Sequence, residues 1–260
     1  MIIEFLGTGT SHGIPVLSCH CAVCRSTDPA NTRFRSSLYI RGDSGESILI
    51  DCGPEFRLQA LRAGIDRLDA VLLTHAHADH LHGLDDLRPL SRRRKIKLYA
   101  NSVSGAELRR RFRYAFPGKG KKQGDEGGGK PRFRLNIVEE PFKVGAIRIS
   151  PIPLKHGSLD ISGWRMEEGS KTLVYASDVK YIEDTSRALV KGADILILGA
   201  LRSSPHSTHF SFEEALAASR ELAAGSVWFT HFCHEHSHRD IVRLIAPDAA
   251  PARDTLRLIL

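Results

Sequence analysis

The residues best suited to chemistry lie in one short stretch at positions 74–80, which reads Thr-His-Ala-His-Ala-Asp-His. Neutral imidazole and carboxylate groups are good ligands for zinc and similar divalent ions. Packing alone does not explain such density, because every buried imidazole needs hydrogen-bonding partners. We therefore interpret the stretch as a metal site, in preference to a polar loop whose histidines occur by chance.

The spacing within this stretch indicates two ligand directions. His75 and His77 follow the apolar run 71–73 and are two residues apart, so on an extended chain their side chains point the same way. Asp79 and His80 then face a second point in space, and one loop can thereby serve two neighbouring ions. Metalloprotease helices differ, because they place their histidines at i and i+4.

With Gly83-Leu84 after it, the motif resembles the signature of the metallo-β-lactamase-fold hydrolases, and the resemblance extends along nearly the whole chain. It implies an α/β (α+β) protein, an αββα four-layer sandwich in which two mixed β-sheets are flanked by helices. It also implies a two-metal site at one edge of the sandwich. The substrate does not follow, because one fold hosts many functions.

The elements that must position these residues can be read from the hydrophobic pattern. Strands are expected at 2–6, 37–41, 47–50, 69–73, 97–100, 133–138, 146–154, 161–166, 172–175, 194–198, 227–229 and 256–260, and helices at 54–63, 83–92, 104–114, 211–224 and 239–245. Three further candidate ligands, His156, Asp178 and His231, each come just after a predicted strand. Strand ends are rigid platforms, so we expect these side chains to converge at one edge.

Matched to the family pattern, the resemblance assigns His75, His77 and His156 to a first metal ion and Asp79, His80 and His231 to a second, with Asp178 bridging them. Two divalent ions, zinc or manganese, would hold a bridging hydroxide as the nucleophile. Asp79 and His209 are the residues assigned to catalysis. His209 precedes the expected helix at 211–224, and His206 is a nearby alternative for the substrate contact.

A second metal candidate is the cluster Cys19, Cys21 and Cys24. Three of the 5 cysteines lie within six positions, which favours a closed zinc site in a reducing compartment over a disulfide framework, although unliganded thiols are an alternative. The pattern is similar to that of the cyclic-phosphate phosphodiesterases of the carbon–phosphorus lyase pathway. That resemblance implies His234 as the fourth ligand, and a structural zinc loop at about 18–36.

Composition bounds the remaining possibilities. The chain has 260 residues, 42% hydrophobic and 26% charged, which is typical of a globular protein, and we expect a single domain over 1–260. No apolar run reaches the ~20 residues of a membrane span. Nor does the N-terminus have a secretory pattern, so we expect a cytoplasmic protein without a membrane partner. A basic, glycine-rich and flexible insertion is expected at 117–130, serving as a substrate lid, a nucleic-acid arm or a tolerated surface loop.

The leading hypothesis is a dinuclear metal-dependent phosphodiesterase that hydrolyses small phosphodiesters or cyclic phosphates, such as ribosyl 1,2-cyclic phosphate. The net charge of +7 favours anionic substrates. One alternative function is an RNA-processing nuclease of the tRNase Z type, whose partner would be nucleic acid. A lactonase or thioester hydrolase and a metal-stabilised binding module are further alternatives. The nearest resemblance also suggests a homodimer.

Overall fold

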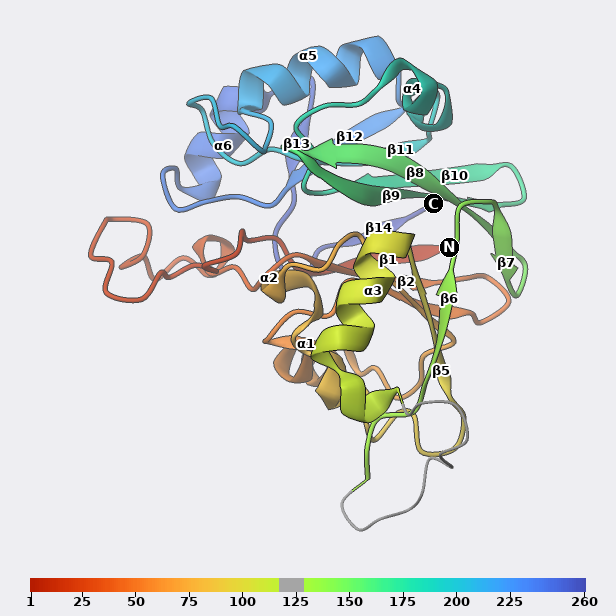
Figure 1. Cartoon of the computed structure of the whole chain (residues 1–260). Coiled ribbons are helices and arrows are strands. Elements are labelled where there is room, and N and C mark those ends of the chain that lie inside the picture. Colours follow the sequence, from red (N-terminus) through yellow and green to blue (C-terminus); the bar gives the residue numbers. More distant parts are fainter. Residues whose placement is uncertain (117–128) are drawn as a thin grey trace.

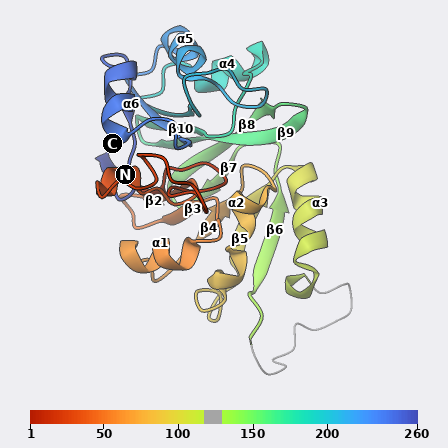
Figure 2. The same cartoon turned by 90° about the vertical axis from the view of Figure 1, so that its left-hand side faces the viewer.

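The computed structural model of the chain describes residues 1–116 and 129–260. Its strands form two mixed sheets of seven strands each. The sheets stack face to face, and helices cover the outer face of each one (Figures 1 and 2). The arrangement confirms the αββα sandwich that the sequence predicted.

The first sheet contains strands from the N-terminal half of the chain, and the last strand of the chain forms one of its edges. Its order is β14-β1-β2-β3-β4-β5-β6, with β3 to β6 parallel and the remaining pairs antiparallel. The bounds are β1 Ile2–Gly7, β2 Ser37–Arg41, β3 Ser47–Ile50, β4 Ala70–Leu72, β5 Ile96–Ala100, β6 Phe133–Ile137 and β14 Arg257–Ile259.

The second sheet has the order β13-β12-β11-β10-β9-β8-β7, and here β10 to β13 are parallel. The long antiparallel pair β8 and β9 lies beside β10. The bounds are β7 Phe142–Val144, β8 Ile147–His156, β9 Leu159–Glu168, β10 Lys171–Ala176, β11 Ile195–Gly199, β12 Ser226–Thr230 and β13 Ala250–Pro251.

The helices divide between the two sheets (Figure 1). On the first sheet lie α1 Phe56–Ala63, α2 Ala78–Leu81 and α3 Ser102–Arg111, and on the second lie α4 Asp184–Val190, α5 Phe212–Leu222 and α6 His238–Ile245. Short 3₁₀ turns occur at η1 Pro29–Asn31, η2 Leu84–Leu87 and η3 Arg113–Ala115. None of the helices in the described part of the chain is long and apolar enough to cross a bilayer.

Successive side chains along each strand point to opposite faces of the sheet, and this alternation forms the hydrophobic core. On β3, Ile48 and Ile50 point into the centre of the sandwich, whereas Leu49 points outward to the helices of the first sheet. Trp164 and Tyr175 bring the second sheet into the same central cluster, and both side chains are buried. Burial on both faces explains why the central strands read as continuous apolar runs.

Several local signals in the sequence act as expected. Gly64 ends α1 in the left-handed conformation, with φ of 67°. Ser211 and Glu214 form the predicted capping box at the start of α5. That helix ends at Leu222, two residues before its predicted end, with Ala223 in the left-handed conformation.

The predicted helix over 83–92 is wrong. Only the 3₁₀ turn η2 forms there, and Pro89 has no backbone N–H with which to continue a helix. Gly83 also packs so closely on the backbone of Gly53 that a Cβ atom would lie 2.0 Å from the carbonyl oxygen. The helix expected at 104–114 instead spans α3, because Asn101 caps it by accepting from the Ser104 N–H. The insertion expected at 117–130 lies outside the described residues except for its last two.

Candidate metal centres and active site

The predicted ligands lie where strands end. The motif follows β4, and α2 begins inside it at Ala78. His156 is the last residue of β8, Asp178 comes two residues after β10, and His231 directly follows β12. His231 has a φ of 65°, a strained backbone conformation for a non-glycine residue and one that is common at functional sites.

The structure brings these side chains into two adjoining groups, each with ligand atoms within 4.8 Å of one another. The first group contains His75, His77 and His156, and the second contains Asp79, His80, Asp178 and His231. The rings of His75 and His80 join the groups, with centroids 4.2 Å apart. These are the seven residues that the sequence predicted as ligands of two metal ions.

The second group has the spacing of ligands around a cation. His80 Nε2 lies 3.2 Å from Asp79 Oδ2 and 3.3 Å from Asp178 Oδ1, and His231 Nε2 lies 3.2 Å from Asp178 Oδ2. Two ligand atoms at ~2.1 Å from one tetrahedral ion would be about 3.4 Å apart. His75 Nε2, His80 Nε2 and Asp178 Oδ1 are buried, and none has a hydrogen-bond partner among the described residues. Buried polar atoms without partners are costly, so a bound cation fits this space.

Hydrogen bonds to Nδ1 set the tautomer of three of the imidazoles. His80 Nδ1 donates to Asp51 Oδ2 at 2.7 Å, and His156 Nδ1 donates to the Thr208 carbonyl oxygen at 2.9 Å. His231 Nδ1 lies 3.1 Å from Ser36 Oγ, whose own hydrogen is donated to the Gly9 carbonyl oxygen. Each ring therefore directs its Nε2, the nitrogen left to bind a cation, at the shared space, as metal-ligating histidines do.

Asp51 is the residue that the sequence analysis missed. It directly follows β3, is fully buried and has a φ of 60°. Besides the bond from His80, it accepts hydrogen bonds from the backbone N–H and the hydroxyl of Thr74, each at 2.8 Å. Its position just after an apolar strand, shared with the predicted ligands, is the signal that could have identified it.

The charges at the site call for a cation. Burial opposes ionisation of Asp178, but His231 and His80 outweigh burial and hold the pKa of this carboxyl well below its usual range. Burial likewise disfavours a charged His80, yet Asp178 and Asp79 raise the pKa of the ring well above its usual value. By contrast, burial and then His80 lower the pKa of His75 well below its usual value. A proton or a metal ion is thus required between the carboxylates.

His209 lies against the ligands, and His206 is one ring further away. The His209 ring centroid is 4.6 Å from that of His156 and 4.9 Å from that of His231, and its Nδ1 is 4.0 Å from Asp178 Oδ2. The His206 ring lies behind it at an interplanar angle of 50°, with centroids 5.2 Å apart. Burial, followed by His231, lowers the pKa of His209 to about 3.

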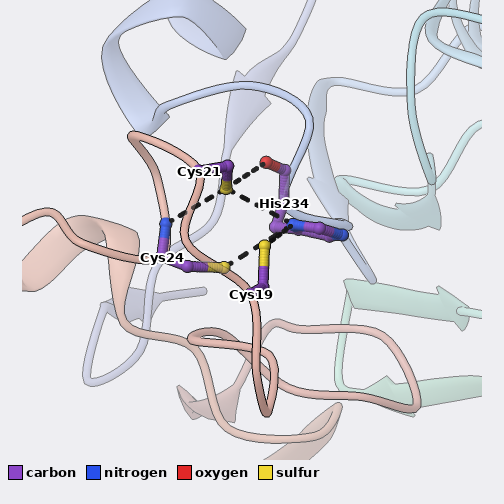
Figure 3. Close-up of side chains that lie close together, drawn as sticks. All are labelled: Cys19, Cys21, Cys24 and His234. Carbon is purple, nitrogen blue, oxygen red and sulfur yellow. Dashed lines mark hydrogen bonds between the residues drawn. The ribbon is translucent and has the colours of Figure 1, made fainter.

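The three predicted cysteines and His234 form a separate group (Figure 3). Nδ1 of His234 is 3.4 Å from Cys19 Sγ and 3.5 Å from both Cys21 Sγ and Cys24 Sγ. One ring nitrogen cannot donate to three sulfurs at once. Ligands of a tetrahedral zinc, with bonds of ~2.3 Å to sulfur and ~2.05 Å to nitrogen, would be about 3.5 Å apart, so the spacing fits a zinc ion.

Backbone donors also favour thiolate at this cluster. The Cys24 N–H donates to Cys21 Sγ at 3.4 Å, and this bond, followed by the contact with His234, lowers the pKa of Cys21 to about 6. The Val16 N–H likewise donates to Cys24 Sγ, although burial raises the pKa of that thiol to about 11. Cys233, next in the chain to His234, lies outside the group of described ligands.

The two centres are linked through the segment after β12. His231 belongs to one group and His234 to the other, and Phe232 lies between them. The Phe232 N–H donates to the Thr8 carbonyl, and the Thr10 N–H donates to the Phe232 carbonyl, each at 3.0 Å. These bonds hold the loop after β1, which leads to the cysteines, against the end of β12.

Residues 46–232 match the model of the Beta-lactamase superfamily domain. The chain belongs to this superfamily, and its fold is the metallo-β-lactamase α/β sandwich.

Three known proteins show how far the likeness extends. A crystal structure of a diphosphatase from the PhnP family is 35% identical, with a TM-score of 0.89, covering 100% of this chain and 97% of that one. An octanoyltransferase of Porphyromonas gingivalis (strain ATCC BAA-308 / W83) is 36% identical over 259 residues, 98% of this chain and 51% of that protein. Human tRNase Z, short form, is 19% identical with a TM-score of 0.67, covering 100% of this chain and 99% of that one, and shows the fold alone.

The chain spans about half the length of the octanoyltransferase that it matches. About half of that relative therefore has no counterpart in this chain, and its name applies to the longer protein. The likeness to the PhnP-family diphosphatase, in contrast, runs over nearly the whole of both chains.

Proposed function

We propose that this protein is a dinuclear metal-dependent hydrolase of small phosphodiesters, including cyclic phosphates. One observation carries the proposal: two adjoining groups of ligand residues, all but His77 buried, share one edge of the sandwich, and the ring of His209 lies against both. An imidazole beside a two-cation site suits a phosphoryl group, which needs cations and a hydrogen-bond donor at its oxygens.

The comparisons support the phosphoryl substrate over a carbonyl one. The diphosphatase covers the whole chain at 35% identity and acts, by its name, on a phosphorus-containing substrate. The octanoyltransferase supports an acyl substrate less directly, because this chain spans only about half of it.

The roles of the residues follow from their positions. When bound, two divalent ions would lower the pKa of a water molecule and neutralise charge on the phosphoryl oxygens. His75, His77 and His156 would hold one ion, while Asp79, His80 and His231 would hold the other. Asp178, which has an oxygen within 4.8 Å of a His156 nitrogen as well as of the ligand atoms of the second group, would lie between them. A ring N–H of His209 would donate to a phosphoryl or leaving-group oxygen.

The cysteine group would hold a structural zinc. Three thiols and one imidazole make a closed set with no position left for substrate. Such an ion adds to the free energy of folding, because the unfolded chain has no preformed site. Here it would fasten the loop containing Cys19 to the end of β12.

The proposal is tested by the hydrolysis of bis(p-nitrophenyl) phosphate, a ribose cyclic phosphate and a dinucleoside diphosphate, after zinc or manganese is supplied. We expect metal-dependent turnover that His77→Ala and Asp178→Asn reduce at least 100-fold. Asp184→Asn, at a side chain that is 93% exposed, serves as the matched control. Octanoyl-coenzyme A is the acyl comparison, and turnover of this thioester without turnover of any phosphodiester would refute the proposal.

An RNA-processing nuclease is the second candidate, favoured by the basic surface. Arg109, Arg110 and Arg113 are exposed on and after α3, and the net charge is +7. Cleavage of a precursor tRNA, with binding that weakens steeply as salt rises, would support this reading. Cyclic phosphate turnover that exceeds tRNA cleavage in kcat/KM would support the first.

A further inference from the structure

His77 differs from the other imidazoles of the first group. His75 Nδ1 lies 3.0 Å from the Thr74 hydroxyl, and His156 Nδ1 donates to the Thr208 carbonyl. In the part of the chain that the structure describes, neither ring nitrogen of His77 has a hydrogen-bond partner, and the residue is exposed. Its ring packs edge to face on those of His75 and His156, with centroids 4.4 and 5.2 Å away, so without a hydrogen bond the ring depends on its backbone for orientation.

The peptide that joins His75 to His77 is held from a distant helix. Nη1 of Arg111, in the last turn of α3, donates to the Ala76 carbonyl oxygen at 2.8 Å, across 35 positions of sequence. Ala76 is buried, and the Arg111 side chain is 32% exposed. A charged donor to a carbonyl oxygen in such a setting makes a stronger bond than a neutral one.

The guanidinium of Arg111 is oriented within its own helix. Nε of Arg111 donates to Glu107 Oε2 at 3.1 Å, one turn earlier in α3. Arg110 pairs with the same carboxylate, its Nη2 lying 2.7 Å from Glu107 Oε2, but among the described residues it has no hydrogen bond to the motif. The two neighbouring arginines therefore share a partner and differ in the one contact to Ala76.

The helix that holds Arg111 is itself fixed on the first sheet. Leu108 is fully buried, and a Cβ at Gly105 would lie 2.2 Å from the Ile137 side chain, so α3 packs tightly on β6. Its N-terminal cap, Asn101, also reaches the Asp160 carbonyl at 3.3 Å. Figures 1 and 2 both show α3 beside α2, the helix that begins inside the motif.

The segment after Arg111 contacts the chain on the other side of the motif. The Phe112 ring meets the His82 ring edge to face at 6.3 Å, and the Tyr114 hydroxyl donates to Asp85 Oδ1 at 2.7 Å. The end of α3 and η3 thus touch residues both before and after α2.

We propose that Arg111 is a positioning residue for metal binding, which holds the Ala76 peptide so that His75 and His77 face one ion. This inference rests on the proposed two-metal site, and it assigns to a residue outside the ligand set the support that the His77 ring lacks. Arg111 touches neither substrate nor ion in this role, so its effect is exerted through His77.

The test compares Arg111→Met with Arg110→Met in the full-length protein. Zinc affinity is measured by chelator competition, with metal content by mass spectrometry and thermal unfolding of the metal-free protein alongside. We expect Arg111→Met to weaken one of the two histidine-site ions about 10-fold or more, the size typical of lost support to a ligand. We expect Arg110→Met to bind both ions like the wild type, and Arg111→Lys to fall in between.

A double-mutant cycle separates positioning from a general structural role. Because Arg111 acts through His77, the His77→Ala variant has already lost the ligand that Arg111 positions, so adding Arg111→Met should cost clearly less affinity there than in the wild type. An equal loss in both backgrounds, or a metal-free midpoint that falls as much as metal affinity does, would overturn the inference. If the wild type itself binds no ion at the histidine groups, the proposed function fails instead.

Discussion

Asp51 accepts a hydrogen bond from Nδ1 of His80 at 2.7 Å, in the fully buried space behind the second ligand group. The carboxylate lies on the opposite side of the ring from the ligand space. It fixes the tautomer without occupying a ligand position, so its removal should affect metal binding before it affects the fold.

We predict that Asp51→Asn weakens metal binding at the second group by about 10–100-fold. An amide offers one acceptor oxygen where the carboxylate offers two, so either the Thr74 N–H or the His80 ring loses its acceptor. Chelator competition measures the effect, and circular dichroism checks the fold. Asp184→Asn is the control, and unchanged affinity in Asp51→Asn would contradict the prediction.

The number of metal ions bound per chain should distinguish the cysteine group from the two histidine-containing groups. We expect three ions per wild-type chain and two in Cys21→Ser, with a lower unfolding temperature because the structural ion is lost. Cys233→Ser should retain all three, since this thiol lies outside the ligand groups of the described residues. Elemental analysis after dialysis measures the counts, and three ions in Cys21→Ser would exclude zinc binding by the cysteine group.

His238 should make the protein less stable in acid. Burial, followed by the Arg33 guanidinium 3.0 Å from Nδ1, lowers the pKa of His238 to about 4. The folded state therefore keeps the ring neutral, and this contribution is present above the unfolded pKa of ~6.5 and lost as pH falls towards 4. Urea unfolding with chelator present, at pH 7.5 and 5.0, should show a smaller loss for His238→Gln than for the wild type. Equal losses would contradict this.

Ala223→Gly should stabilise the protein. Ala223 ends α5 with φ of 48° and ψ of 47°, a left-handed conformation that costs a non-glycine residue about 1–2 kcal/mol. Glycine removes this cost but adds freedom to the unfolded chain, leaving a gain of roughly 0.5–1 kcal/mol. Ala224→Gly, at a position without positive φ, should be neutral or destabilising. Urea midpoints for the two variants check the sign.

The layers, and the convergence of the seven candidate ligands, could be predicted because their signals are local. Several apolar runs are followed by a residue that could bind metal, as Leu154 is by His156, and the resemblance of the motif to the family signature indicates the fold. The helix over 83–92 was mispredicted because tertiary packing decides there: Gly83 must approach the backbone of Gly53, whatever the propensity of the residues after it.

The support around the ligands could not be predicted, because each supporting contact joins residues far apart in the chain. Asp51 meets His80 across 29 positions, Ser36 meets His231 across 195, and Arg111 meets Ala76 across 35. Serine, arginine and aspartate are common in loops and helices, and nothing in their local sequence marks them as partners of a particular ring.

Every ligand group takes members from both sheets or from both ends of the chain. His75 shares its group with the later residue His156, Asp79 with Asp178, and Cys19 with His234. A growing polypeptide that has not yet reached residue 234 thus lacks at least one donor of the cysteine group, and one that stops before 156 can complete none of them. Under the proposed metal binding, ions would be bound late in biosynthesis, and each would act as a cross-link that must be released before the two halves can separate.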